Sequence, residues 1–223
     1  MKKSYETFRR NFENAKRIWN LEEDWITPVE YLPYIDALLG DIDLDPCSTE
    51  KANKDFIHAK NFYTKKEDGL NTEIAWTGKV YCFPPTYGRC SYSKKRGSWR
   101  WSLRGGAGAM SPSIAWFRRL EKEWKLRNIY EALFFSCNHE MMRAFPDMWN
   151  YPICIPTDRA NLIKGNDYYR FDNPFTWGFF IYLPPPSLSV EPAERFRDIF
   201  SNIGKIINRV SSSFYLATHV HDL

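Results

Sequence analysis

The feature that most constrains the fold is the stretch at residues 79–88, where an apolar, β-prone run meets a double proline. Proline donates no backbone hydrogen bond and fixes φ, so a strand has to end at Pro84 in a stiff turn. Open α/β sheets bind their ligands at the carboxyl ends of strands, beside turns of this kind. The turn therefore predicts where the functional site lies.

Apolar runs of strand length alternate with segments of helical period along the rest of the chain. Strands are expected at residues 42–45, 79–83, 131–137, 151–156 and 175–183. Helices are expected at residues 4–18, 28–39, 113–127, 138–149 and 191–210, the last interrupted by Gly204. Such alternation is typical of an α/β domain with a mostly parallel sheet and helices on both faces.

The helix expected at residues 28–39 carries capping signals at both ends. Thr27 is predicted as its N-cap, Pro28 as its first residue and Gly40 as its C-cap. Pro33 either kinks this helix or delays its start. For the whole chain we expect a helix and connector at 1–23, one domain at 24–210 with a basic insertion at 89–111, and a tail at 211–223.

The basic insertion is the candidate contact for nucleic acid. No acidic residue lies between Glu73 and Glu121, and residues 89–111 interleave cations with aromatic side chains. Such a pattern suits phosphate neutralisation together with base stacking, although a solvated basic loop is the alternative. The residues concerned are Arg89, Lys94, Lys95, Arg96, Trp99, Arg100, Trp101 and Arg104.

Other ligand classes are not indicated. The five cysteines and four histidines lack the paired spacing of a disulfide framework or a zinc site, so no metal is expected. No apolar run approaches the roughly 18 residues of a membrane span, and no signal segment follows the first residue. We therefore expect no membrane contact and a location in the cytoplasm, bacterial or phage-infected, or in a nucleus. Nothing indicates the oligomeric state.

Several short motifs occur in a fixed order along the chain. They lie at residues 24–28, 41–48, 67–70 and 76–78, followed by the Pro-Pro turn. Their order and spacing resemble the phage-type Dam-like family of adenine-specific DNA methyltransferases, from about Asp24 to Leu183. Further on, Ile114, Trp116, residues 138–145 and Arg159 look like later parts of the same family pattern.

The resemblance implies a Rossmann-like methyltransferase fold that uses S-adenosylmethionine and acts on DNA. Thr27 and Pro28 would then lie against the methionine end of the cofactor. Asp45 and Pro46 would lie under the cofactor, and Asp68 would hydrogen-bond its ribose or adenine. All of these roles are implied by the family pattern at these positions.

The Pro-Pro turn looks like the Asn/Asp-Pro-Pro-Tyr signature of the family, with Phe83, Pro84, Pro85, Thr86 and Tyr87 as the candidate catalytic residues. In that signature a side-chain oxygen and a backbone carbonyl accept the hydrogens of the target amine, and the aromatic ring stacks on the flipped base. Here Phe83 offers no acceptor, and the tyrosine stands one place late.

Three functions remain open at this point. The leading expectation is methyl transfer to the 6-amino group of adenine in DNA. The first alternative is a DNA-binding protein of methyltransferase fold that has lost transfer. The second is transfer to an acceptor that needs no amine-binding oxygen.

Overall fold

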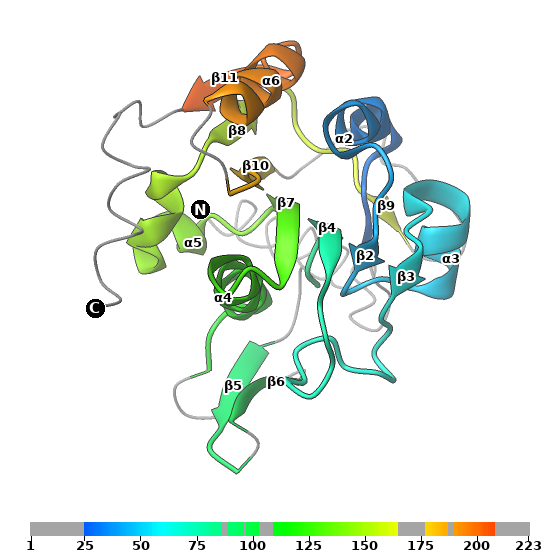
Figure 1. Ribbon diagram of the computed structural model, residues 1–223, viewed down its shortest axis with the longest axis vertical. Coiled ribbons are helices and arrows are strands. Elements are labelled where there is room, and N and C mark those ends of the chain that lie inside the picture. Colours follow the sequence, from blue (N-terminus) through cyan, green and yellow to red (C-terminus); the bar gives the residue numbers. More distant parts are fainter. Residues whose placement is uncertain are drawn as a thin grey trace, which may run out of the picture.

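The computed structural model describes residues 25–85, 89–95, 97–102, 109–164, 177–186 and 190–207. The helix expected at 4–18, with its connector, and the tail at 211–223 lie outside these residues. The centre is a sheet of seven strands in the order β11-β8-β10-β7-β4-β2-β3 (Figure 1). These strands are β2 (Leu44–Asp45), β3 (Asn61–Phe62), β4 (Gly78–Cys82), β7 (Ile129–Ser136), β8 (Ile153–Pro156), β10 (Phe179–Leu183) and β11 (Gly204–Ile207).

The sheet is mixed. β2 pairs in parallel with β3 and β4, and β4 pairs in parallel with β7. β10 is antiparallel to both β7 and β8, and β11 is antiparallel to β8. The expected α/β architecture is confirmed, whereas the two reversed strands make the sheet less parallel than the alternating pattern predicted.

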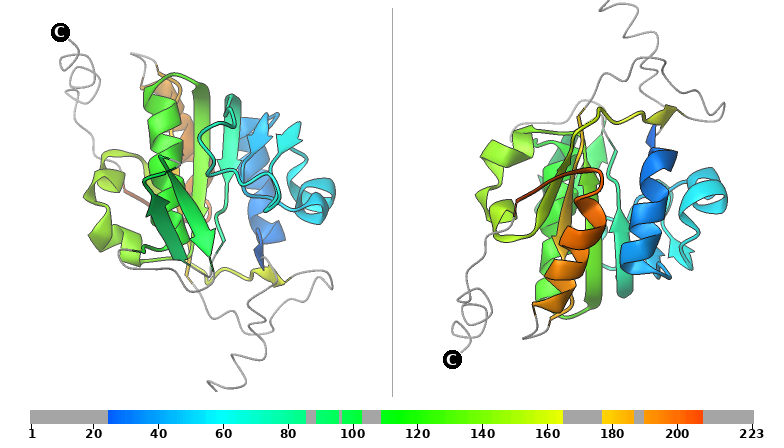
Figure 2. Two further views of the ribbon diagram at one scale, coloured as in Figure 1. Left: turned by 90° about the horizontal axis from the view of Figure 1, so that it is seen from below. Right: turned by 90° about the horizontal axis from the view of Figure 1, so that it is seen from above.

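Helices cover both faces of the sheet, as expected. α4 (Pro112–Lys125) and α5 (Glu140–Ala144) pack on one face, and α2 (Leu32–Leu39) and α6 (Glu191–Phe200) on the other (Figure 2). β4 and the residue after it contribute side chains to the hydrophobic core on both faces of the sheet, because side chains alternate along a strand. Val80 and Cys82 join the α4 side, while Tyr81 and Phe83 join the α2 side.

The capping predictions around α2 are half right. Gly40 ends the helix with a φ of 62°, and its N–H donates to the Asp36 carbonyl over 2.8 Å. Thr27 is not the N-cap, because a short 3₁₀ turn, η1 (Val29–Tyr31), precedes α2 and the helix begins only at Leu32. Pro33 lies in the first turn of α2, so the delayed start is the alternative that holds.

Three further helix predictions need correction. The helix expected at 138–149 is split into α5 and the 3₁₀ turn η3 (Pro146–Asn150), because the residue before Pro146 leaves the helical region. The last helix ends at Phe200, and Gly204–Ile207 pair with β8 as β11. Conversely, α3 (Glu50–Ala52) and η2 (Asn53–Ile57) were not expected; the Thr49 side chain accepts a hydrogen bond from the Ala52 N–H and caps α3.

The basic insertion contains a β-hairpin where the sequence predicted an irregular loop. β5 (Arg89–Ser93) pairs antiparallel with β6 (Ser98–Ser102) and lies alongside α4 (Figure 2). Cys90 is fully buried and exchanges two backbone hydrogen bonds with Met110, of 2.8 and 2.9 Å. The hairpin is therefore tied to the core at its base. A second two-stranded sheet joins β1 (Trp25–Ile26) to β9 (Ile163–Lys164).

A buried acid at the start of β7 gives a test of the packing of α6. Glu131 is 1% exposed and accepts hydrogen bonds from Arg195 Nη2, at 2.6 Å, and from the Tyr182 hydroxyl. Arg195→Met leaves this carboxylate with only the tyrosine, so we expect a loss of about 2 kcal/mol in the free energy of unfolding. Urea unfolding measures it.

The matched control is Arg197→Met on the same helix. Arg197 pairs with Asp198 over 3.4 Å at an exposed position, and its removal should cost less than about 1 kcal/mol. Equal losses in the two variants would contradict a stabilising role for the Glu131–Arg195 pair.

Candidate functional site

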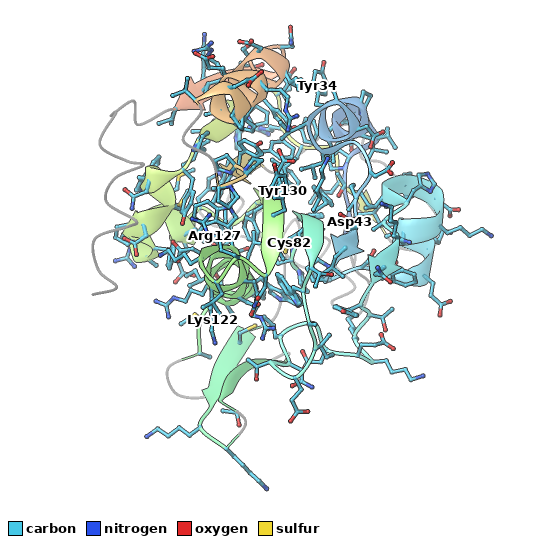
Figure 3. The ribbon with its side chains drawn as sticks, in the orientation of Figure 1. Tyr34, Asp43, Cys82, Lys122, Arg127 and Tyr130 are labelled. Carbon is cyan, nitrogen blue, oxygen red and sulfur yellow. The ribbon has the colours of Figure 1, made fainter. Side chains whose placement is uncertain are left out.

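The site lies where the chain reverses its direction of travel across the sheet. From β2 the chain passes to β3 on one side and then returns to form β4 on the other, all three strands being parallel. In open α/β sheets ligands bind at such a reversal, in a crevice outside the carboxyl ends of the two strands that flank it, and we use the word crevice for this place between β2 and β4. Here those ends are Asp45 on β2 and Cys82 on β4, the latter near the centre of the sheet in Figure 3.

Two cysteines join these strand ends. The Sγ atoms of Cys47 and Cys82 are 3.6 Å apart, and the Phe83 N–H hydrogen-bonds the Cys47 sulfur. Burial raises the pKa of both thiols, so both stay protonated near neutral pH. This pair was not predicted from the sequence. Each cysteine lies beside a proline that ends a strand, and this shared position is the signal that could have suggested their contact.

Asp45 is the buried acid of the crevice. It is 4% exposed, and its Oδ1 accepts a hydrogen bond of 3.2 Å from the Cys47 N–H, with a second from the Ser48 side chain. Burial nevertheless raises the pKa of Asp45 to about 6, because these neutral donors offset only part of the desolvation. Among the described residues, no Lys or Arg forms an ion pair with this carboxyl.

The segment that includes Thr27 and Pro28 lies against β4. Thr27 Oγ1 and the Tyr81 hydroxyl share a hydrogen bond of 2.7 Å, and both side chains are buried. Burial raises the pKa of Tyr81, and the nearby charge of Asp45 raises it further. The Thr27 side chain, predicted to cap a helix, is instead part of the crevice wall, and Pro28 is buried beside it.

Asp68 precedes Gly69, which packs against the end of β2. A Cβ atom at Gly69 would lie 2.0 Å from the Pro46 carbonyl oxygen and 2.9 Å from the Trp116 ring, so only glycine fits there. Asp68 itself has a left-handed backbone, with a φ of 57°. Aspartate adopts that conformation more readily than most residues, and strain of this kind often accompanies binding sites.

The Pro-Pro turn follows β4 at the same edge. Phe83 is 8% exposed, and its ring centroid is 4.9 Å from that of Phe135 in the core below α2. Pro84 is buried and Pro85 half-buried. The aromatic residue at the first position of the signature is thus part of the hydrophobic core. Thr86 and Tyr87 lie outside the described residues.

The candidate DNA contacts are distributed along the hairpin. Lys94 and Lys95 are exposed in the turn between β5 and β6. Backbone alone is described for four others, in β5 or β6: Arg89, Trp99, Arg100 and Trp101. Arg96 and Arg104 lie outside the described residues.

Two other cations of the acid-free interval have structural partners. Lys79 Nζ donates to the Leu39 carbonyl over 2.7 Å at the end of α2. Arg119 is 7% exposed and lies 2.9 Å from Glu123. Neither side chain belongs to a phosphate-binding surface.

The described residues contain neither a cluster of metal ligands nor a membrane-spanning helix. No three side chains of His, Cys, Asp or Glu gather there as metal ligands would. None of the helices in this part of the chain combines the length and apolar character that crossing a bilayer takes.

Comparison with protein-family models, with curated proteins and with solved structures gave no match. The resemblance to adenine-specific methyltransferases is therefore one of ordered sequence motifs.

Asp45→Asn tests the buried carboxyl. The fold raises the pKa from 3.8 to about 6, so ionisation of Asp45 destabilises the folded state. This cost is absent below about pH 4 and complete above about pH 6. The parent should therefore lose stability over that interval relative to the Asn variant, by roughly 3 kcal/mol at most. Urea unfolding across the pH range measures the difference.

Asp41→Asn is the matched control, since Asp41 is 86% exposed in its side chain and pairs with Lys60 over 3.5 Å. Its difference from the parent should vary little over the same interval. A constant difference between the parent and the Asp45 variant would show that the carboxyl titrates normally.

Proposed function

We propose that the protein binds S-adenosylmethionine in the crevice between β2 and β4 and transfers its methyl group to the 6-amino group of adenine in DNA. One observation carries this proposal. Segments matched by the family resemblance lie far apart in the sequence, yet Thr27, Pro46 and Gly69 each contact the ends or flanks of β2 and β4. Their convergence is what a shared ligand requires.

The residues present suit a cationic, ribose-bearing cofactor. Asp45 is a buried carboxyl with neutral hydrogen-bond donors and, among the described residues, no basic partner, so it can accept from an ammonium group or a ribose hydroxyl. Asp68 is half-buried and precedes Gly69, which lies against Pro46, so its carboxylate is a second candidate acceptor. When bound, S-adenosylmethionine supplies a methyl group on a positively charged sulfur.

The acceptor side of the crevice supports slow transfer. The carbonyls of Pro84 and Pro85 remain as candidate acceptors for the hydrogens of an amine. The buried ring of Phe83 contributes none, and loss of one preorganised polar partner commonly lowers a rate by two to three orders of magnitude. We therefore expect turnover well below that of an enzyme with Asn or Asp at this position.

The packing of Phe83 against Phe135 favours a second candidate function. In this alternative the protein binds cofactor and DNA but transfers no methyl group, because the first position of the signature has become part of the core. Both candidates share the cofactor crevice and the DNA contacts, and they differ only in chemistry.

The hairpin supports DNA as the partner in either case. Lys94 and Lys95 occupy its exposed turn, and Arg89 and Arg100 belong to its strands. A two-stranded ribbon is narrow enough to enter a DNA groove, and cations along it neutralise phosphates.

A labelled-methyl transfer assay on unmethylated DNA, beside a titration with S-adenosylmethionine, tests the proposal. Labelled 6-methyladenine is the expected product, at a low rate. Binding of cofactor without transfer would favour the second candidate, and absence of cofactor binding would overturn both.

Phe83→Asn extends this assay, because its shorter, polar side chain can leave the core under α2 and offer an amide oxygen at the end of β4, which should raise transfer at least about 10-fold. Phe83→Leu is the matched control, since it shortens the same buried side chain without adding an oxygen. Circular dichroism checks that both variants fold. Equal activity in the two variants would argue against a polar role for this position.

The hairpin prediction concerns salt dependence. Replacing Lys94, Lys95 and Arg96 together by glutamine should weaken DNA binding by a similar factor across sequences. Three lost phosphate contacts should also lower the slope of log affinity against log salt by about 2 to 3. Fluorescence anisotropy at several salt concentrations measures both effects.

Lys122, Lys125 and Arg127 provide the control triple. α4 leads directly into β7, so these residues lie near the start of β7, at the end of the strands opposite to the carboxyl ends of β4 and β7. Glutamine at all three should leave the slope nearly unchanged. An equal effect from the two triples would mean that the hairpin is no specific phosphate contact.

A further inference from the structure

A second group of residues lies at the crevice edge of the sheet, beyond β4. Phe179, the first residue of β10, pairs with Ser136, the last residue of β7. Because β10 runs opposite to β7 and β8, the residues before β10 and those after β8 meet at one edge. That edge is the carboxyl edge, which also carries the Pro-Pro turn after β4. Trp177 and Arg159 are among the residues it brings together.

Arg159 and Trp177 form a cation–π pair. The guanidinium carbon of Arg159 is 5.7 Å from the centroid of the Trp177 ring. Trp177 is 39% exposed, an unusual fraction for so large an apolar side chain, and Arg159 is exposed. A tryptophan face offers a stacking surface to any nucleobase, and a neighbouring guanidinium can stack on the base or bind its phosphate.

The position of this pair is set by a glycine. A Cβ atom at Gly178 would lie 2.4 Å from the Phe135 ring, so the backbone beside Trp177 rests directly on that ring. Phe135 in turn packs on Phe83, the residue that opens the Pro-Pro turn. The chain of contacts from Gly178 through Phe135 to Phe83 connects the cation–π pair to the turn.

We propose that Arg159 and Trp177 form a platform for an unstacked nucleobase and its phosphate on the carboxyl edge of the sheet, beyond the Pro-Pro turn. This inference deepens the proposed function and rests on it, since it assumes a nucleic-acid acceptor. Among residues 83–85 of the Pro-Pro turn the one aromatic ring, that of Phe83, is buried in the core, whereas Trp177 is an exposed ring that can stack on a base drawn out of the duplex.

Binding to two DNA probes tests the platform. The first probe is a single-stranded oligodeoxyadenylate, and the second is a duplex with one unpaired adenine, which is compared with the same duplex fully paired. Trp177→Ala should weaken single-strand binding about 10-fold and abolish the preference for the unpaired adenine. Arg159→Ala should weaken single-strand binding by a smaller factor. Trp177→Phe should retain most of the affinity for the single strand.

Tyr130→Ala is the matched control. Tyr130 is 56% exposed near the start of β7, at the opposite edge of the sheet, so its loss should leave both probes unaffected. Urea unfolding of each variant separates loss of binding from loss of folding. The conservative Trp177→Phe variant keeps the test decisive if the alanine variant is unstable.

The same samples are titrated with S-adenosylmethionine, which keeps the two proposals apart. Cofactor binding that persists in Trp177→Ala, together with lost single-strand binding, supports the platform. Parental DNA affinity in Trp177→Ala and Arg159→Ala overturns it and leaves the cofactor proposal standing. A parent that binds single-stranded DNA through Trp177 but binds no cofactor supports the platform and overturns the methyltransferase function. A parent that binds neither probe overturns the platform.

Discussion

The crevice depends on the burial of β4 on both of its faces. This strand has parallel neighbours on either side and helices above and below, so each of its side chains has one possible direction. The Cys82 side chain points toward Cys47, and the Tyr81 side chain points toward Thr27. Phe83, one residue further, must then enter the core under α2. The alternation of a single strand therefore both builds the crevice and removes the first signature residue from it.

Asp45 lowers the stability of the folded protein at neutral pH. An acid buried among neutral groups destabilises the folded state at neutral pH, and an asparagine could fill the same space without that cost. Natural proteins tolerate such conflicts mainly at functional sites. A cationic ligand would offset the desolvation of this carboxylate. The free protein and its complex with such a ligand should therefore differ most in stability above about pH 6, where Asp45 is ionised.

Local signals in the sequence predicted the features that depend on nearby residues. The strand end at Pro84, the helix α4 and the cap at Gly40 follow from proline, periodicity and glycine, and all are present. The hairpin was missed because its strands carry cations and serines, and its turn lacks a strong glycine pair. Residues 204–207 form a strand by pairing with the edge of β8, which the sequence around Gly204 does not indicate. The Thr27–Tyr81 and Cys47–Cys82 contacts depend on sheet register, which no local pattern contains.

The insertion of β10 between β7 and β8 has a consequence for how the chain reaches this structure. β10 lies between β7 and β8 in the described sheet but follows both in the sequence. Until residues 179–183 have been synthesised, β7 therefore has no neighbour on that side and β8 is not joined to β7. Both present unpaired backbone edges while the chain emerges from a ribosome, and such edges pair readily with other chains. The central sheet can close only late in synthesis, over contacts of long sequence separation, which slows folding. The part of the carboxyl edge that carries Arg159 and Trp177 should thus be among the last parts of the molecule to acquire its final shape.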